Sequence, residues 1–228
     1  SPADRASWRS GTGVTAFLLD GPEAAKVTLL LAHGAGAAMD SPAMEGIAGA
    51  LASAGLRGAR FEFGYMALRR ETGTRRPPPK AETLVAEYRA AVAALAARGP
   101  LVIGGKSMGG RVASMVADEL HAAGSVAGLL CLGYPFHPPD RPEQLRTQHL
   151  EQLATSALIC QGTRDPFGSR EEVAGYRLSP SVEILWLEDG DHDLRPRKRV
   201  TGLTAGDHLR RMAETVASWA ARLGRGGA

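Results

Sequence analysis

The sequence predicts a mostly parallel α/β fold in which one central sheet is covered by helices on both faces. Short apolar runs alternate along the chain with longer segments whose apolar residues recur at helical spacing. The short runs are continuously apolar and do not alternate with polar residues, which is typical of parallel strands that are buried on both faces. Together these two patterns predict repeated strand and helix units within a single layered domain.

The strands are expected in the apolar runs, beginning with an edge strand at residues 15–19. The six further runs are residues 27–32, 57–63, 101–104, 126–132, 157–161 and 182–187. Helical spacing predicts helices over residues 44–54, 81–98, 108–123, 143–153 and 205–223. Three consecutive prolines at positions 77–79 interrupt regular structure, so residues 66–80 are expected to form a long loop.

The length of 228 residues and the formal net charge of +3 predict one ordinary domain over residues 15–228, preceded by an N-terminal extension over residues 1–14. Cys131 and Cys160 lie inside apolar runs, so we expect buried, reduced thiols. No run reaches the 18 or more apolar residues of a membrane span, and no signal pattern opens the chain. We therefore expect a cytoplasmic monomer or homodimer with no membrane or nucleic-acid partner.

The sharpest motif is G-K-S-M-G at residues 105–109, between a predicted strand and a predicted helix. In this context G-x-S-x-G forms a sharp turn that exposes a nucleophilic serine, here Ser107. By itself the pentapeptide also fits a plain glycine-rich turn. A phosphate-binding loop is disfavoured because Pro100 occupies the position of its first glycine and residues 101–104 form the strand.

A serine nucleophile needs a base and an orienting carboxylate. Asp165 follows the predicted strand 157–161, and His192 follows the strand 182–187. Either residue alone also fits a solvated turn, but the order Ser, Asp, His at successive strand ends favours a triad. Asp191 and Asp193 are the next candidates for the acid. A calcium loop around them is improbable because its twelfth position is Val200.

An acyl-transfer site also needs N–H donors for the oxyanion of the tetrahedral intermediate. The residue after the nucleophile, Met108, is expected to supply one of them. The loop after the strand 27–32 reads H-G-A-G at residues 33–36, and Ala35 is the second expected donor. His33 is interpreted as a structural residue of this loop.

With these motifs the chain resembles the α/β-hydrolase superfamily over about residues 15–223. The segments 61–66, 133–139 and 187–192 resemble a compact subgroup that is similar to dienelactone-hydrolase-like and testis-expressed hydrolase-like proteins. The resemblance implies an α/β-hydrolase fold and a Ser-His-Asp triad that needs no cofactor and no metal. Dienelactone hydrolases proper use a cysteine nucleophile where this chain has Ser107.

Too few residues separate the strands 126–132 and 157–161 to hold a cap domain, so we expect an open site that takes a small ester or thioester. The residues expected to contact substrate are Tyr65, Arg69, Arg70, Tyr134 and Phe167. The basic segments 69–80 and 195–199 fit either an anionic substrate or a solvated surface. The alternative function is a catalytically silent scaffold that binds a protein or nucleic acid through these basic loops.

Overall fold

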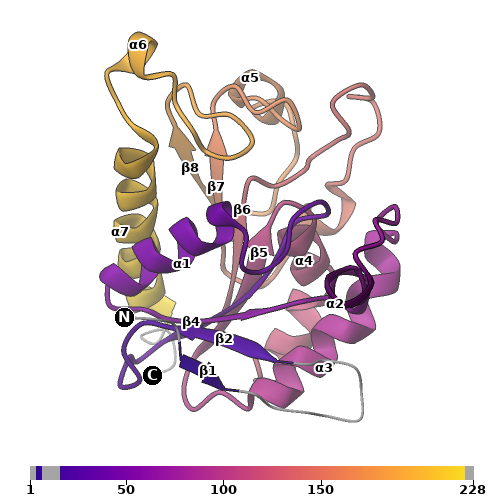
Figure 1. Cartoon of the computed structure of the whole chain (residues 1–228). Coiled ribbons are helices and arrows are strands. Elements are labelled where there is room, and N and C mark those ends of the chain that lie inside the picture. The colour runs from indigo at the N-terminus through magenta and orange to yellow at the C-terminus, as the bar shows by residue number, and fades with distance from the viewer. Residues whose placement is uncertain (1–3, 7–15, 224–228) are drawn as a thin grey trace.

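The computed structural model describes residues 4–6 and 16–223, and of residues 4–6 it describes the backbone only. One eight-stranded sheet runs in the order β1-β2-β4-β3-β5-β6-β7-β8. The strands are β1 (Asp4–Ala6), β2 (Phe17–Asp20), β3 (Thr28–Ala32), β4 (Arg57–Phe61), β5 (Leu101–Lys106), β6 (Gly128–Leu132), β7 (Ala157–Gly162) and β8 (Val182–Leu187). From β4 to β8 all neighbours are parallel, so their carboxyl ends lie at one edge of the sheet (Figure 1).

Helices connect most of these strands. The α-helices are α1 (Pro42–Ser53), α2 (Gly64–Thr72), α3 (Val85–Leu95), α4 (Met108–Ala122), α5 (Arg170–Val173), α6 (Lys198–Thr201) and α7 (Ala205–Leu223). Two short 3-10 helices, η1 (Ala81–Leu84) and η2 (Gln148–Leu150), complete the regular structure of the described residues. The predicted helix 205–223 is confirmed to the residue, and the predicted helices at 44–54 and 108–123 are confirmed within two residues at each end.

Two apolar cores lie on opposite faces of the sheet. On one face Ile103 and Cys131 pack with α3 and α4, and on the other Val102 and Leu130 pack with α1 and α7. This alternation follows the period of two along each strand. Figure 1 shows α1 beside α7 on one side of the sheet and α3 and α4 on the other. The predicted parallel sheet covered on both faces is therefore confirmed.

The first predicted strand lies one place further into the sheet than expected. β2 pairs antiparallel with β4 on one side and with β1 on the other, so β1 and not β2 is the edge strand. Residue 15, the first of the predicted strand, lies outside the described residues. β1 falls within the segment 1–14 that the sequence predicted as an extension, and the rest of that segment also lies outside them.

The predicted helix at 143–153 is wrong. This segment forms turns around η2, although its composition favours a helix. Tertiary hydrogen bonds hold it in another path: the Arg146 N–H donates to Phe136 O at 2.8 Å, and the Tyr134 hydroxyl donates to Arg146 O at 2.8 Å. Distant partners thus override a weak local helix propensity.

The predicted loop at 66–80 is wrong in its first half, where α2 extends to Thr72 and ends at Gly73 with φ 69°. Glycine adopts this left-handed conformation without steric cost, which makes it a common helix terminator. The rest of the segment, including the three prolines, is irregular as expected. α2 lies against the loop after β3.

The two cysteines are free and fully buried, as expected. Burial raises the pKa of the Cys160 thiol to about 12, and it also raises the pKa of the Cys131 thiol. Between β6 and β7 the described chain holds only η2, so no cap domain covers the carboxyl edge. Among the described residues no helix combines the length and the apolar character that a membrane crossing requires.

Candidate active site

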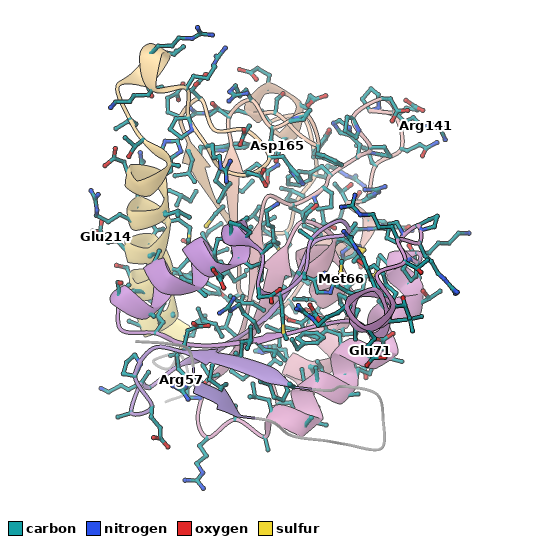
Figure 2. The ribbon with its side chains drawn as sticks, in the orientation of Figure 1. Arg57, Met66, Glu71, Arg141, Asp165 and Glu214 are labelled. Carbon is teal, nitrogen blue, oxygen red and sulfur yellow. The ribbon has the colours of Figure 1, made fainter. Side chains whose placement is uncertain are left out.

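Three side chains from distant parts of the chain meet at the carboxyl edge of the sheet. The Ser107 hydroxyl lies 2.8 Å from His192 Nε2, and His192 Nδ1 lies 2.8 Å from Asp165 Oδ2. Ser107 directly follows β5, Asp165 follows β7 and His192 follows β8. Figure 2 labels Asp165 in the loop after β7. The order and the strand ends are those that the sequence predicted.

Ser107 occupies a strained turn between β5 and α4. Its φ of 50° and ψ of −119° are unusual for a residue with a side chain. The flanking glycines leave room for this turn: a Cβ on Gly109 would lie 2.5 Å from Ala32 O, and one on Gly105 would also collide with that oxygen. The turn thus needs glycine on both sides of Lys106 to Met108 because the end of β3 packs directly against it.

Asp165 is fully buried, and hydrogen-bond donors surround its carboxylate. Besides His192, Gln161 Nε2 donates to Oδ2 at 3.1 Å and the Phe167 N–H donates to Oδ1 at 2.8 Å. Gln161 also donates to Tyr134 O and accepts from the Tyr134 N–H. Sequence reasoning missed Gln161, although a glutamine at the end of the apolar run 157–160 is a signal for a buried polar role.

His192 is held in place by contacts from three neighbouring segments. Phe167 stacks on it with ring centroids 4.1 Å apart, and a Cβ on Gly133, where φ is 66°, would lie 2.8 Å from His192 O. Lys106 and Asp193, the residues next to Ser107 and His192, form an ion pair at 2.7 Å. This pair ties the turn at Ser107 to the loop that carries His192.

The other acidic residues near His192 have partners of their own. Asp189 binds Arg197 through both carboxylate oxygens, and this contact lowers the pKa of Asp189 to about 2. Asp191 Oδ1 accepts the N–H groups of residues 193 and 195, which shapes the turn. Asp165 is therefore the only one of the three candidates for the acid, among the described residues, whose carboxylate bonds to the His192 ring.

The loop after β3 is held by side chains at three successive carbonyls. His33 Nδ1 contacts Gly34 O at 2.6 Å, the Tyr65 hydroxyl donates to Ala35 O at 2.9 Å, and Arg69 Nη1 donates to Gly36 O at 3.0 Å. Tyr65 and Arg69 are four residues apart on α2 and so lie on one face. α2 therefore fixes the path of the loop beside Ser107.

The tautomer of His33 follows from its contacts. The Phe63 N–H can only donate and lies 3.2 Å from His33 Nε2, so Nε2 accepts and Nδ1 carries the proton that is donated to Gly34 O. In a trans peptide the N–H of residue 35 points away from the carbonyl of residue 34. Because His33 holds that carbonyl, it also sets the direction of the Ala35 N–H.

Acidification is expected to destabilise the fold through this histidine. Burial lowers the pKa of His33, so the folded chain resists a proton that the unfolded chain accepts below about pH 6.5. Since the unfolded state then binds more protons, the temperature at the midpoint of thermal unfolding should fall when the pH is lowered from about 7.5 to about 5.5. The fall should be smaller in His33→Asn, and an equal fall in both proteins would contradict a neutral His33.

Two cavities open at Ser107 and share Ala35, Ser107 and Phe167 in their walls. The first, the α1 cavity, has about 490 Å³ and continues along the start of α1 and past His192. The second, the η1 cavity, has about 350 Å³ and continues past η1, Met108 and Pro135. If a ligand has a bond at Ser107, the groups on the two sides of that bond can therefore occupy different cavities.

The five residues predicted to contact substrate have different positions in the structure. Phe167 lines both cavities, and the half-buried Tyr65 binds the loop after β3. Tyr134 is fully buried, so its prediction as a substrate contact is wrong. Arg69 is bonded to Gly36 O, and Arg70 forms ion pairs with Glu62 and Asp40 that raise its pKa.

A second serine and histidine pair lies elsewhere in the domain. Ser114 Oγ and His149 Nε2 are 2.6 Å apart, and Ser114 also donates to Arg111 O. Ser114 is buried within α4, and the nearby Asp118 carboxylate accepts from the backbone N–H groups of residues 154 and 155. Among the described residues no carboxylate bonds to the His149 ring, and neither Ser114 nor His149 lines a cavity at Ser107.

Comparison with known proteins agrees with the fold. The chain is similar to a dienelactone hydrolase from Anabaena variabilis (TM-score 0.72, 20% identity, covering 97% of this chain and 99% of the other). It is similar to an alpha-beta serine hydrolase homologue from Coxiella burnetii (0.69, 19%, 93% and 96%). A serine hydrolase without a lid from Xanthomonas campestris also matches (0.68, 19%, 97% and 96%).

A family model described as an alpha/beta hydrolase domain matches residues 25–221, which is most of the chain. The matched segment begins three residues before β3, ends two residues before the end of α7, and includes every residue of the Ser107, His192 and Asp165 arrangement. The chain therefore belongs to the alpha/beta hydrolase domain family.

Proposed function

We propose that this protein is a serine hydrolase that cleaves a small ester or thioester through an acyl-enzyme. The observation that carries the proposal is the unbroken hydrogen-bond chain from Ser107 through His192 to Asp165. Asp165 accepts the proton of His192 Nδ1, which leaves Nε2 free to accept the proton of the Ser107 hydroxyl. A buried carboxylate, an oriented imidazole and a strained serine are the groups that acyl transfer requires.

In the first half of the reaction Ser107 Oγ attacks the carbonyl carbon while its proton passes to His192 Nε2. Asp165 stabilises the imidazolium that forms. His192 then gives the proton to the leaving oxygen or sulfur, and the acyl group remains on Ser107. In the second half a water molecule attacks the acyl carbon, His192 takes its proton, and Ser107 regains that proton as the acid leaves.

The oxyanion is stabilised by the N–H groups of Ala35 and Met108. Met108 is the first residue of α4, so its N–H has no acceptor within the helix. Ala35 lies in the wall of both cavities with Ser107, and His33 and Tyr65 hold the peptides on either side of it. A donor of this kind typically stabilises the transition state by about 3 to 4 kcal/mol.

A fluorophosphonate probe tests the proposal directly, because it phosphonylates activated serines with loss of fluoride. Intact-mass measurement should show one adduct on the parent protein and none on Ser107→Ala. Ser114→Ala is the matched control, since it removes the hydroxyl of the other serine and histidine pair and should leave labelling intact. A folded parent that takes no label would favour a binding module without catalysis.

Tyr65→Phe should lower kcat with little change in KM. The substitution removes only the hydroxyl that donates to Ala35 O and keeps the ring, which packs edge-on to His33. One hydrogen bond of this kind is worth about 1 kcal/mol, so we expect a loss of about 2- to 10-fold. Tyr176→Phe is the control because its hydroxyl makes no hydrogen bond within residues 16–223. An unchanged kcat in Tyr65→Phe would show that the Tyr65 hydroxyl does not help to position the Ala35 N–H.

A further inference from the structure

Cationic side chains gather in the η1 cavity beside Ser107. Lys80, Arg111 and Arg146 all line it, and Glu82 is the only carboxylate in its wall. These cations come from three separate parts of the chain: the segment before η1, the first turn of α4 and the loop after β6. The cavity thus carries a positive charge that its own residues do not neutralise.

Arg111 is only partly satisfied. Its Nη2 donates to Glu82 Oε1 at 2.8 Å, but its side chain is 17% exposed while that of Glu82 is 60% exposed. The Arg111 Nε atom is buried and makes no hydrogen bond in the part of the chain that the structure describes. An unpaired buried N–H costs stability unless a ligand or water bonds to it.

Arg146 carries a charge without a counterion. Within residues 16–223 no carboxylate forms an ion pair with its guanidinium, and the guanidinium donates no hydrogen bond. Burial and then the neighbouring Arg111 lower the pKa of Arg146. Two partly buried guanidinium groups that repel each other are stabilised when an anion lies between them.

Three other arginines of the surrounding loops already have partners. Arg70 pairs with Glu62 and Asp40, Arg197 pairs with Asp189, and Arg69 donates to a backbone carbonyl. The contrast separates arginines that hold loops together from Arg111 and Arg146, which face the cavity. On the other side of Ser107 the α1 cavity has one arginine in its wall, Arg195, whereas the η1 cavity brings two together.

We infer that the η1 cavity binds an anionic group of the substrate, a carboxylate or a phosphate, between Arg111 and Arg146. Guanidinium groups match the oxygen geometry of both anions. The inference rests on the proposed function, because it names the class of ester or thioester that the Ser107 site takes. Ser107 lines the same cavity as Arg111 and Arg146. A substrate whose anionic group binds to the two arginines would therefore have its scissile bond at Ser107.

Matched ester pairs test the inference. Mono-4-nitrophenyl adipate and 4-nitrophenyl hexanoate differ by a carboxylate at the end of the acyl chain. 4-(Carboxymethyl)phenyl butyrate and 4-ethylphenyl butyrate differ in the same way on the leaving group. We expect kcat/KM to be about 10- to 100-fold higher for the anionic member of at least one pair, as for a charged hydrogen bond.

The variant Arg146→Gln should reduce this preference by about the same 10- to 100-fold, and Arg146→Lys should keep part of it because the charge remains. The control is Arg141→Gln, which should keep the full preference. Arg141 lies on the same loop after β6 (Figure 2). Its side chain is 61% exposed and does not line the cavity. Thermal unfolding of each variant confirms that it is folded.

Calorimetric titration with adipate gives a readout that does not need turnover. Adipate should bind the parent protein and Arg141→Gln alike and should bind Arg146→Gln about 10-fold or more weakly. Absence of a preference for either anionic ester, or a preference and adipate binding that persist in folded Arg146→Gln, would overturn the inference. Missing fluorophosphonate labelling with intact adipate binding would instead overturn only the proposed function.

Discussion

Ser107→Ala is expected to lower kcat by about 10⁶-fold, since loss of a nucleophilic serine removes the whole covalent route at once. The change deletes one oxygen, whose contact in the described structure is His192 Nε2 at 2.8 Å. Alanine accepts the φ of 50° no worse than serine does, so the midpoint of thermal unfolding should stay close to that of the parent. Turnover of 4-nitrophenyl butyrate measures the loss.

The matched variant for this experiment is Ser114→Ala, in the buried pair with His149. It should keep turnover within a few-fold of the parent. If Ser107→Ala turns over the ester at the parent rate, Ser107 is not the nucleophile. If Ser114→Ala loses turnover while folded and Ser107→Ala does not, the roles of the two serines are reversed.

Asp165→Asn is expected to lower kcat by about 10⁴-fold. The carboxylate accepts hydrogen bonds from His192, Gln161 and the Phe167 N–H, whereas an amide must turn one donor toward them. If that NH₂ group faces His192, then Nδ1 must accept a hydrogen bond and the ring proton moves to Nε2. A protonated Nε2 cannot take the proton of the Ser107 hydroxyl. If it faces the Phe167 N–H, two donors oppose each other in a buried site.

Asp193→Asn is the comparison for this variant, because Asp193 was an alternative acid and instead pairs with Lys106. It should change kcat far less than Asp165→Asn does. The rate of fluorophosphonate labelling should likewise fall far more in Asp165→Asn than in Asp193→Asn, and this measurement does not depend on the choice of ester. A fully active Asp165→Asn would show that the imidazole is oriented by another group.

The sequence alone predicted the parts whose signals are local. The apolar runs gave the seven longer strands, and the G-K-S-M-G motif between a strand and a helix gave the position of Ser107. Asp165 and His192 were predictable because parallel strands end at one edge of a sheet. The helix predicted at 143–153 failed where local propensity was opposed by bonds to residues 134 and 136.

Only the tertiary structure decided which basic residues are free. Arg70 and Arg111 look alike in sequence, but Arg70 pairs with Asp40, 30 positions away, while Arg111 keeps a buried Nε without a partner. An arginine is neutralised by carboxylates that the fold brings near it, and sequence distance does not encode that proximity. The order of Ser107, Asp165 and His192 at successive strand ends was therefore a property of the sequence, whereas the charge of the η1 cavity beside them is a property of the fold.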